Sequence, residues 1–193
     1  MIRVLAVIFA VIAAIASGWL GYRLSLARST AATAGPTSEQ VLAVQARDSA
    51  TADQALARLR SASFADVGGH PQSVQQWSGK VLVVNFWATW CPPCREEMPG
   101  FSRLQRKLSA KGVQFVGIGV DDADKIRQFV KDFPVAYPLW VADLDTMDLT
   151  RDLGNNTEGL PFTLLIDRTG QVRMAHAGYM DEADIERRLH ELL

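Results

Sequence analysis

The sequence predicts an α/β fold, in which buried strands alternate with helices along most of the chain. Two near-continuous apolar runs, VLVVNFWA at 81–88 and VQFVGIGV at 113–120, are typical of strands buried on both faces of a sheet. Each run is followed by a segment with helical character, and this alternation is the pattern of α/β domains. The chain has 193 residues, which is enough for one such domain with extensions.

The chain begins with a long apolar segment. Val4–Tyr22 is a run of 19 residues without a charge, and a helix of about 20 apolar residues can cross a bilayer. We therefore predict a transmembrane anchor or signal segment at residues 1–23. The stretch Ala14–Ala16 has the small-x-small form of a cleavage site, but the apolar run continues through Leu20, which favours a retained anchor. Such a segment is the usual form of an export signal, so we expect the following domain outside the cytoplasm.

Two further segments precede the predicted domain. Residues 24–37 are small and polar and are typical of a linker. Residues 38–60 have the composition of a helix, and we predict a helical spacer there. The globular domain is then expected over residues 61–193.

Within 61–193 the predicted elements follow one another in order. Gly68 and Gly69 lie in a hairpin-like turn, and the strand at 81–88 leads into a helix that runs through Leu108. The remaining predicted elements are a strand at 113–120, a helix at 121–132, a short strand within 137–142, a short helix at 145–153, an antiparallel hairpin of 160–167 with 171–179, and a final amphipathic helix at 181–193.

The residues that carry chemistry are the two cysteines, which lie at the junction of the first buried strand and its helix. Cys91 is placed at a helix N-terminus, where unpaired N–H groups and the helix dipole favour a thiolate, the form that attacks disulfides. Cys94 lies one turn further on the same face and can attack a mixed disulfide formed at Cys91. Pro92 and Pro93 suit a first helical turn, where a missing N–H costs little.

Composition argues against several other classes of protein. The net charge of −1 provides no electrostatic footprint for nucleic acid. Two cysteines are too few for a disulfide scaffold or a four-cysteine zinc site, and the three histidines show no ligand spacing. We therefore expect no metal and no cofactor beyond a redox-active Cys91–Cys94 disulfide.

Two motifs, NFWATWCPPCREEMP at 85–99 and GLPFTLLIDRTG at 159–170, resemble the thioredoxin superfamily. More narrowly, they resemble its TlpA/ResA-like family of membrane-anchored thiol–disulfide oxidoreductases. The resemblance covers about residues 61–193 and implies a thioredoxin fold, with a central mixed β-sheet flanked by helices. It also implies that Cys91 is the exposed nucleophile, that Cys94 is the buried resolving thiol, and that Pro161 is a cis proline facing the disulfide.

The same resemblance bears on residues around the cysteines. Its implied substrate-binding residues are Trp90, Pro92, Pro93, Leu160 and Pro161. Ordinary thioredoxins carry a buried aspartate where this chain has Asn85, which we expect to be a hydrogen-bonded polar group of the core. TlpA/ResA-like proteins use a glutamate three residues after the second cysteine, and that position is Glu97. A partly desolvated Glu97 could exchange protons with Cys94, whereas Glu96 is expected to face solvent.

The function implied is dithiol–disulfide exchange, chiefly as a reductant, in a single-pass protein of the bacterial inner membrane with its catalytic domain in the periplasm. The implied partners are protein thiols and disulfides, such as those of apocytochrome c or copper sites, and a membrane-embedded electron donor.

Two alternative functions remain open, a disulfide-forming oxidase and a copper chaperone of thioredoxin fold. Copper chaperones use CxxxC with a distal histidine, for which His176 is the one candidate in the late hairpin. A thiol peroxidase is disfavoured, because its PxxxTxxC motif is absent at Cys91.

Overall fold

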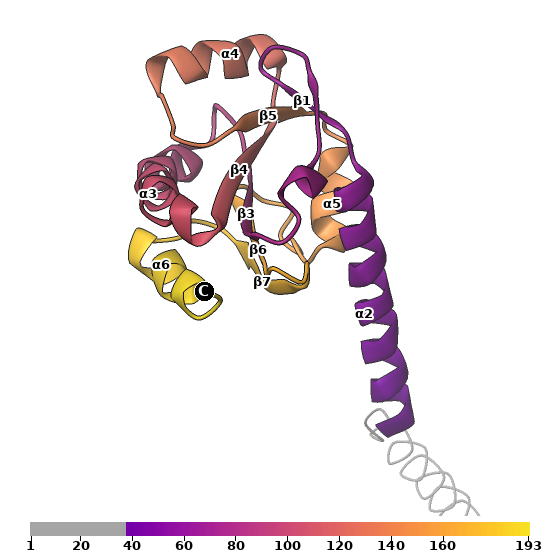
Figure 1. The fold of residues 1–193 in the computed structure, drawn as a ribbon. Helices are drawn as coiled ribbons and strands as arrows, with labels where there is room; N and C mark the ends of the chain where they lie inside the picture. The colour runs from indigo at the N-terminus through magenta and orange to yellow at the C-terminus, as the bar shows by residue number, and fades with distance from the viewer. Residues whose placement is uncertain (1–37) are drawn as a thin grey trace, which may run out of the picture. The chain divides into compact units, whose positions relative to one another are not determined.

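Within residues 38–193, which the computed structural model describes, the strands form one mixed sheet in the order β2-β1-β5-β4-β3-β6-β7 (Figure 1). The central strands β3, β4 and β5 are parallel, while β1, β6 and β7 each run antiparallel to their neighbours. The strands are β1 (Phe64–Asp66), β2 (Pro71–Gln72), β3 (Val81–Trp87), β4 (Val113–Val120), β5 (Leu139–Ala142), β6 (Phe162–Ile166) and β7 (Val172–Ala177).

The predicted helices are all present in the described part of the chain. They are α2 (Ser38–Ser61), α3 (Pro92–Leu108), α4 (Ala123–Asp132), α5 (Thr146–Asp152) and α6 (Glu182–His190), with short 3₁₀ turns η1 (Val74–Trp77) and η2 (Ser109–Lys111). Side-chain caps define two of the starts. Asp122 accepts a hydrogen bond from the N–H of Asp124 at the start of α4, and Asp181 accepts one from the N–H of Ala183 at the start of α6.

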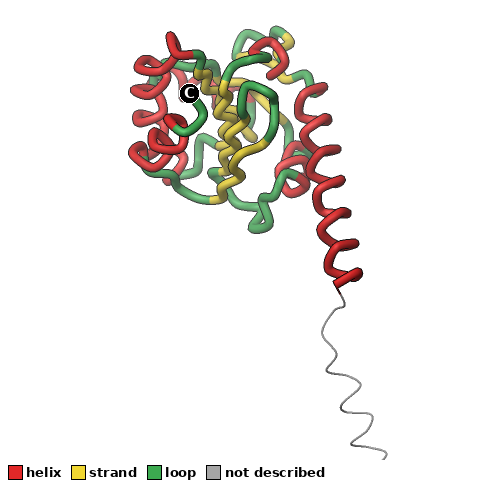
Figure 2. Tube along the Cα trace, turned by 60° about the horizontal axis from the view of Figure 1, so that its bottom comes forward, coloured by secondary structure: helices red, strands yellow, loops and turns green. Residues whose placement is uncertain are grey.

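The two faces of the sheet are covered by different helices, as the period of two in β3 requires. Val81, Val83 and Trp87 point to the core beneath α3, α4 and α6. Leu82 and its alternate neighbours point to the opposite core, which α2 and α5 cover. Figure 2 shows the yellow strands between helices on the two sides. The sheet is therefore buried on both faces, which explains the unbroken apolar sequences of β3 and β4.

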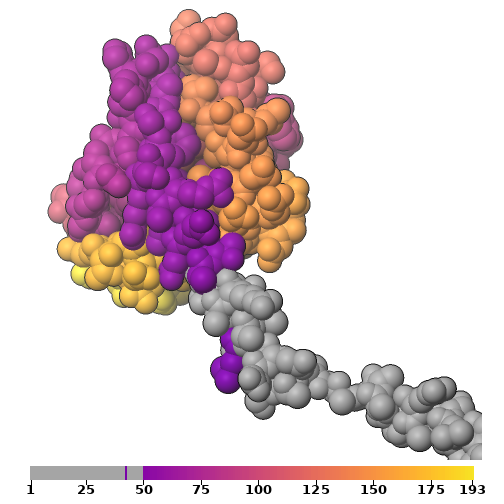
Figure 3. All heavy atoms as spheres, turned by 90° about the vertical axis from the view of Figure 1, so that its right-hand side faces the viewer, coloured from indigo at the N-terminus to yellow at the C-terminus, as the bar shows by residue number. Residues whose placement is uncertain are grey.

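The compact unit that contains the sheet begins at Asp48 and ends at Leu193. Ala55, Leu56 and Leu59 of α2 are buried against this unit. Arg58 of α2 also donates to Asp152 at 2.7 Å, and Figure 3 shows the indigo surface of α2 beside the orange surface of α5. The helix predicted as a spacer thus supplies part of the second core, and the domain boundary at residue 61 stays a prediction.

The predicted anchor or signal segment at 1–23 and the predicted linker at 24–37 lie outside the described residues. Among residues 38–193, no helix combines the length and apolar character needed to cross a membrane.

Candidate active site

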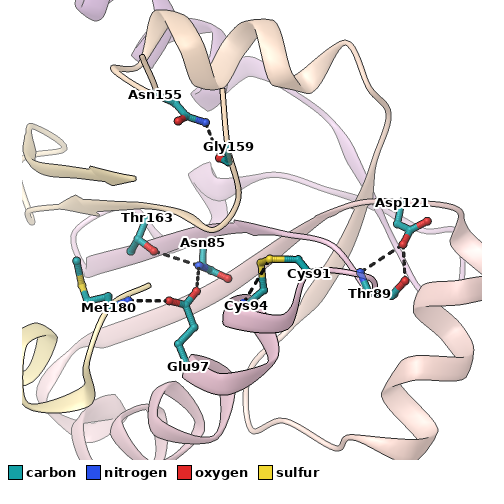
Figure 4. The surroundings of a disulfide bond; sticks show 10 residues. All are labelled: Asn85, Thr89, Cys91, Cys94, Glu97, Asp121, Asn155, Gly159, Thr163 and Met180. Atoms are coloured by element: carbon teal, nitrogen blue, oxygen red, sulfur yellow. Dashed lines mark hydrogen bonds between the residues drawn. A yellow bond between two sulfur atoms is a disulfide. The ribbon is translucent and has the colours of Figure 1, made fainter. Parts of the chain in front are cut away.

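Cys91 and Cys94 form a disulfide at the point where β3 gives way to α3 (Figure 4). Cys91 is the N-cap residue of α3, and the backbone N–H of Cys94 points to Cys91 Sγ with an N···S distance of 3.4 Å. Pro92 and Pro93, the first two residues of the helix, have no N–H to donate. The N–H of Cys94 is therefore the first amide of the helix, and it is aimed at the sulfur atom that would carry negative charge as a thiolate.

Both cysteines are buried in this disulfide form. Cys91 is 3% exposed and Cys94 is 0% exposed. The expectation of an exposed Cys91 is thus wrong for the oxidised state, because its bonded side chain lies in the same core cluster as Trp87 and Met98. The difference between the two cysteines is small but has the expected sense, since Cys94 is the one that solvent does not reach.

Glu97 lies on the buried face of α3, one turn beyond Cys94. Its side chain is 2% exposed, and each carboxylate oxygen accepts one hydrogen bond. Asn85 Nδ2 donates to Oε1 at 2.7 Å, and the backbone N–H of Met180 donates to Oε2 at 3.1 Å. Burial raises the pKa of Glu97 from its ordinary 4.5 to about 7, although both hydrogen bonds oppose this change. A carboxyl group with such a pKa can give or take a proton near neutral pH.

Asn85 connects Glu97 to the strand beside it. Besides Glu97, Asn85 Nδ2 donates to Thr163 Oγ1 at 3.0 Å, and the two residues face each other across the β3–β6 pair. Its carbonyl oxygen Oδ1 is buried without a hydrogen-bond partner in the described residues. The expectation that Asn85 is a satisfied core group is therefore only half correct. The amide fixes the carboxylate of Glu97 and leaves one acceptor unpaired.

Leu160 and Pro161 are joined by a cis peptide bond, as the resemblance implied. Pro161 is buried and Leu160 is half-buried against both cores. The loop that leads to them is held by Asn155, whose side chain is 0% exposed and donates to the carbonyl of Gly159 at 2.9 Å. Gly178 N donates to the carbonyl of Pro161 at 2.8 Å, which fixes the other side of this loop.

The segment before the cysteines is fixed by a residue that the sequence did not single out. The backbone N–H of Thr89 donates to Asp121 Oδ2 at 3.3 Å, and the Thr89 hydroxyl donates to the same oxygen. Lys125 contacts the other carboxylate oxygen of Asp121 at 3.2 Å. The available signal was the position of Asp121, directly after a parallel strand that adjoins β3, because such strand ends meet at one edge of the sheet.

The other residues that the resemblance implied for substrate binding differ in their exposure to solvent. Trp90 is 67% exposed beside Cys91, Pro92 is exposed and Pro93 is half-buried. Trp90 therefore presents a large aromatic surface to solvent. Glu96 is exposed, as expected for a carboxylate on the outer face of the first turn.

Within residues 38–193, no group of three or more His, Cys, Asp or Glu side chains is placed to hold a metal ion. His176, the histidine considered for copper, lies on β7 with its Nε2 3.1 Å from the carbonyl oxygen of Tyr179.

Comparison with known proteins agrees with this geometry. The Redoxin family model matches residues 45–189. The thiol-disulfide oxidoreductase ResA of Geobacillus kaustophilus is 31% identical over 128 residues, which are 66% of this chain and 71% of the relative. The thiol:disulfide interchange protein DsbE of Escherichia coli is 36% identical over 132 residues, 68% of each chain.

Solved structures of thioredoxin-like proteins are also similar to this chain. A thiol:disulfide interchange protein of the thioredoxin family from Chlorobium tepidum superposes with a TM-score of 0.62 at 31% identity, over 68% of this chain and 92% of that one. A thioredoxin-related protein from Neisseria meningitidis has a TM-score of 0.60 at 32% identity, over 67% and 97% of the two chains. The chain therefore belongs to the Redoxin family of the thioredoxin superfamily and is a thiol–disulfide oxidoreductase of the ResA/DsbE type, with its cysteine pair at Cys91 and Cys94.

Proposed function

We propose that this protein reduces disulfides of exported proteins at the periplasmic face of the bacterial inner membrane. The observation that carries the proposal is the Cys91–Cys94 disulfide at the start of α3, with the buried carboxyl group of Glu97 one turn behind it. The reducing direction is the one that the resemblance to TlpA/ResA-like proteins implies, and a relative is named a thiol-disulfide oxidoreductase. The Cys91–Cys94 pair would serve as the redox centre without any further cofactor.

The proposed reaction has two exchange steps. In the first, the Cys91 thiolate attacks one sulfur of a substrate disulfide, forms a mixed disulfide and displaces a substrate thiolate, which takes up a proton. In the second, the Cys94 thiol gives its proton to Glu97 and attacks Cys91 Sγ. This attack breaks the bond between Cys91 Sγ and the substrate sulfur, expels the second substrate thiolate and leaves the Cys91–Cys94 disulfide. The thiolate takes up a proton from water, and Glu97 returns its own proton to water. The substrate gains two electrons and two protons, and a membrane-embedded dithiol donor returns the same number to Cys91 and Cys94.

The proposed substrates are cysteine pairs of exported proteins that must be reduced before they bind haem or a metal. Apocytochrome c thiols awaiting haem and cysteines of copper sites are the two examples that the TlpA/ResA-like resemblance offers. In both, a reductant is needed because an oxidising compartment converts such cysteine pairs to disulfides.

The direction of the reaction is tested by redox equilibrium. We expect titration of the Cys91–Cys94 pair against glutathione, followed by thiol alkylation, to give a potential near that of thioredoxin, about −270 mV. A potential near about −120 mV would favour the alternative, a disulfide-forming oxidase, because the reduced form would then be the more stable one.

Membrane attachment is tested separately. We expect the full-length protein to remain in the membrane pellet after extraction with alkaline carbonate, because Val4–Tyr22 is long enough to span a bilayer. A soluble periplasmic protein that begins near Ser17 would show that the segment is a cleaved signal peptide. A version that lacks residues 1–37 serves as the control and should stay in the supernatant.

A further inference from the structure

A groove of about 290 Å³ runs along the outer side of α3, between this helix and the segment that joins α4 to β5. We call it the α3 groove. Its lining residues are Arg95, Met98, Pro99, Ser102, Arg103 and Arg106 from α3, and Phe129 and Asp132–Val135 from the opposite wall.

The floor of the α3 groove is formed by well-packed residues. Met98, Ser102 and Phe129 are buried, at 2%, 4% and 7% exposure. The hydroxyl of Ser102 also accepts a hydrogen bond from the backbone N–H of Ala136 at 3.1 Å, which ties the two walls together. The groove is therefore a fixed feature of the fold, with an apolar floor that is open to a ligand.

The rim of the α3 groove is positively charged. Three arginines line it against one acid, Asp132. Arg103 is already paired with Glu182, whereas Arg95 and Arg106 form no ion pair with any residue from 38 to 193. The Arg95 guanidinium lies 4.6 Å from the ring centre of Phe133, which is 44% exposed on the opposite wall. Among residues 38–193, Arg95 and Arg106 thus have no acidic partner, although the Arg95 guanidinium already contacts the Phe133 ring.

The length and position of the groove restrict what can occupy it. Arg95 directly follows Cys94, so one end of the groove opens within a helical turn of the reactive pair. Arg106 lies eleven residues further along α3, about 16 Å away along the helix axis. An extended polypeptide rises about 3.3 Å per residue, so roughly five residues connect the two arginines.

We propose that the α3 groove docks an acidic, partly apolar segment of the protein substrate whose disulfide is attacked by Cys91. Carboxylates at the two ends of an extended segment would meet Arg95 and Arg106, and an apolar side chain between them would lie over the groove floor at Met98 and Phe129. This inference rests on the proposed function, for which it defines the substrate class. A concave, narrow surface with an apolar floor fits a peptide better than it fits the flat headgroup layer of a bilayer.

The test uses pairs of small disulfide-bridged peptides that differ only in a five-residue tail, Glu-Leu-Phe-Leu-Glu or Lys-Leu-Phe-Leu-Lys. The reduced protein is mixed with each peptide and kcat/KM is measured. We expect the acidic tail to be preferred by about tenfold, because charge pairs at a partly desolvated interface contribute more than fully exposed ones. The preference should decrease with added salt, since the rim charges are open to solvent.

Two double variants separate the groove from general charge. In Arg95→Gln/Arg106→Gln the preference should fall to between one- and threefold, whereas Arg95→Lys/Arg106→Lys should retain most of it. Lys111→Gln/Arg188→Gln removes two exposed charges elsewhere and should leave the tenfold preference unchanged. Arg106→Gln alone gives an intermediate result if the far end of the groove takes part.

Other outcomes would overturn the proposal in distinguishable ways. If the wild-type protein reduces cystine but treats both tails equally, the docking proposal is wrong and the proposed function stands. If it reduces no disulfide at all, the proposed function fails first. If the Arg95→Gln/Arg106→Gln variant loses binding to phosphatidylglycerol vesicles and keeps the wild-type tail preference, the groove faces lipid rather than substrate.

Discussion

Replacement of Cys91 by serine is expected to abolish disulfide reduction, whereas replacement of Cys94 by serine is expected to stop the reaction at a mixed disulfide. The two outcomes differ because only Cys91 receives the N–H of Cys94 at its sulfur and retains any solvent exposure. We therefore expect Cys91 to carry out the first attack and Cys94 to resolve its product.

The measurement is reduction of insulin by the reduced protein, together with non-reducing electrophoresis and mass spectrometry. Cys91→Ser should give the rate of buffer alone and no adduct. Cys94→Ser should give one substrate equivalent bound through Cys91, released by dithiothreitol. A Cys91→Ser/Cys94→Ser variant controls for non-specific association. Normal turnover of Cys94→Ser would show that the roles of the two cysteines are assigned wrongly.

Replacement of Glu97 by glutamine is expected to slow the second exchange step by about 10²–10⁴-fold and to leave the first largely unchanged. The magnitude is that of a lost general base. Cys94 is 0% exposed in the disulfide form, and we propose Glu97, one turn further along α3, as the acceptor of its proton. The fold should persist, because glutamine has the same shape and its amide oxygen can still accept a bond from Met180 N–H. Its amide nitrogen replaces the oxygen that accepts from Asn85 Nδ2, so the Asn85 amide must turn over and present its unpaired Oδ1 as the acceptor.

The pH dependence of this step follows from the raised pKa of Glu97, about 7. Only the ionised carboxylate can take a proton, so the rate in the wild-type protein should rise with pH and level off above about 7. In Glu97→Gln this rise should be absent, and any remaining dependence should follow hydroxide concentration.

Rapid-quench trapping of the mixed disulfide, from pH 6 to 9, separates the two steps. Glu96→Gln is the matched control, because it removes an exposed carboxylate of the same helical turn. It should show the wild-type rate and pH profile. An equal resolution rate in Glu97→Gln and the wild-type protein would reduce Glu97 to a charge near a helix end and leave water as the base.

Much of the fold follows from local patterns in the sequence. The boundaries of β4 match the apolar run VQFVGIGV residue for residue, and β3 ends at Trp87, one residue before the end of the run VLVVNFWA. A strand buried on both faces has no polar side to interrupt it, so its length can be read from the chain. The start of α6 is likewise a local feature, since it depends on the cap at Asp181, whereas the helix ends at His190 and not at the expected Leu193.

The cysteine pair was likewise determined by the sequence, because its chemistry depends on neighbours within one helical turn. The strand before Cys91 and the prolines after it place the sulfur at a helix N-terminus whatever the remainder of the chain does. The motif around Leu160 and Pro161 also marked the position of the cis bond, through resemblance rather than through any local periodicity.

The tertiary structure alone decided the surroundings of this pair. Glu97 is held by Met180, which is 83 residues away in the sequence and contributes only its backbone N–H, a group that every residue except proline possesses. Thr89 and Asp121 meet only because β3 and β4 end at the same edge of the sheet. Secondary-structure patterns repeat every two or three to four residues and carry no record of such distant pairs. The fold and the reactive sulfurs could therefore be predicted from the sequence. The surroundings of Glu97, the part of the core that α2 contributes and the α3 groove depended on how separate elements pack together.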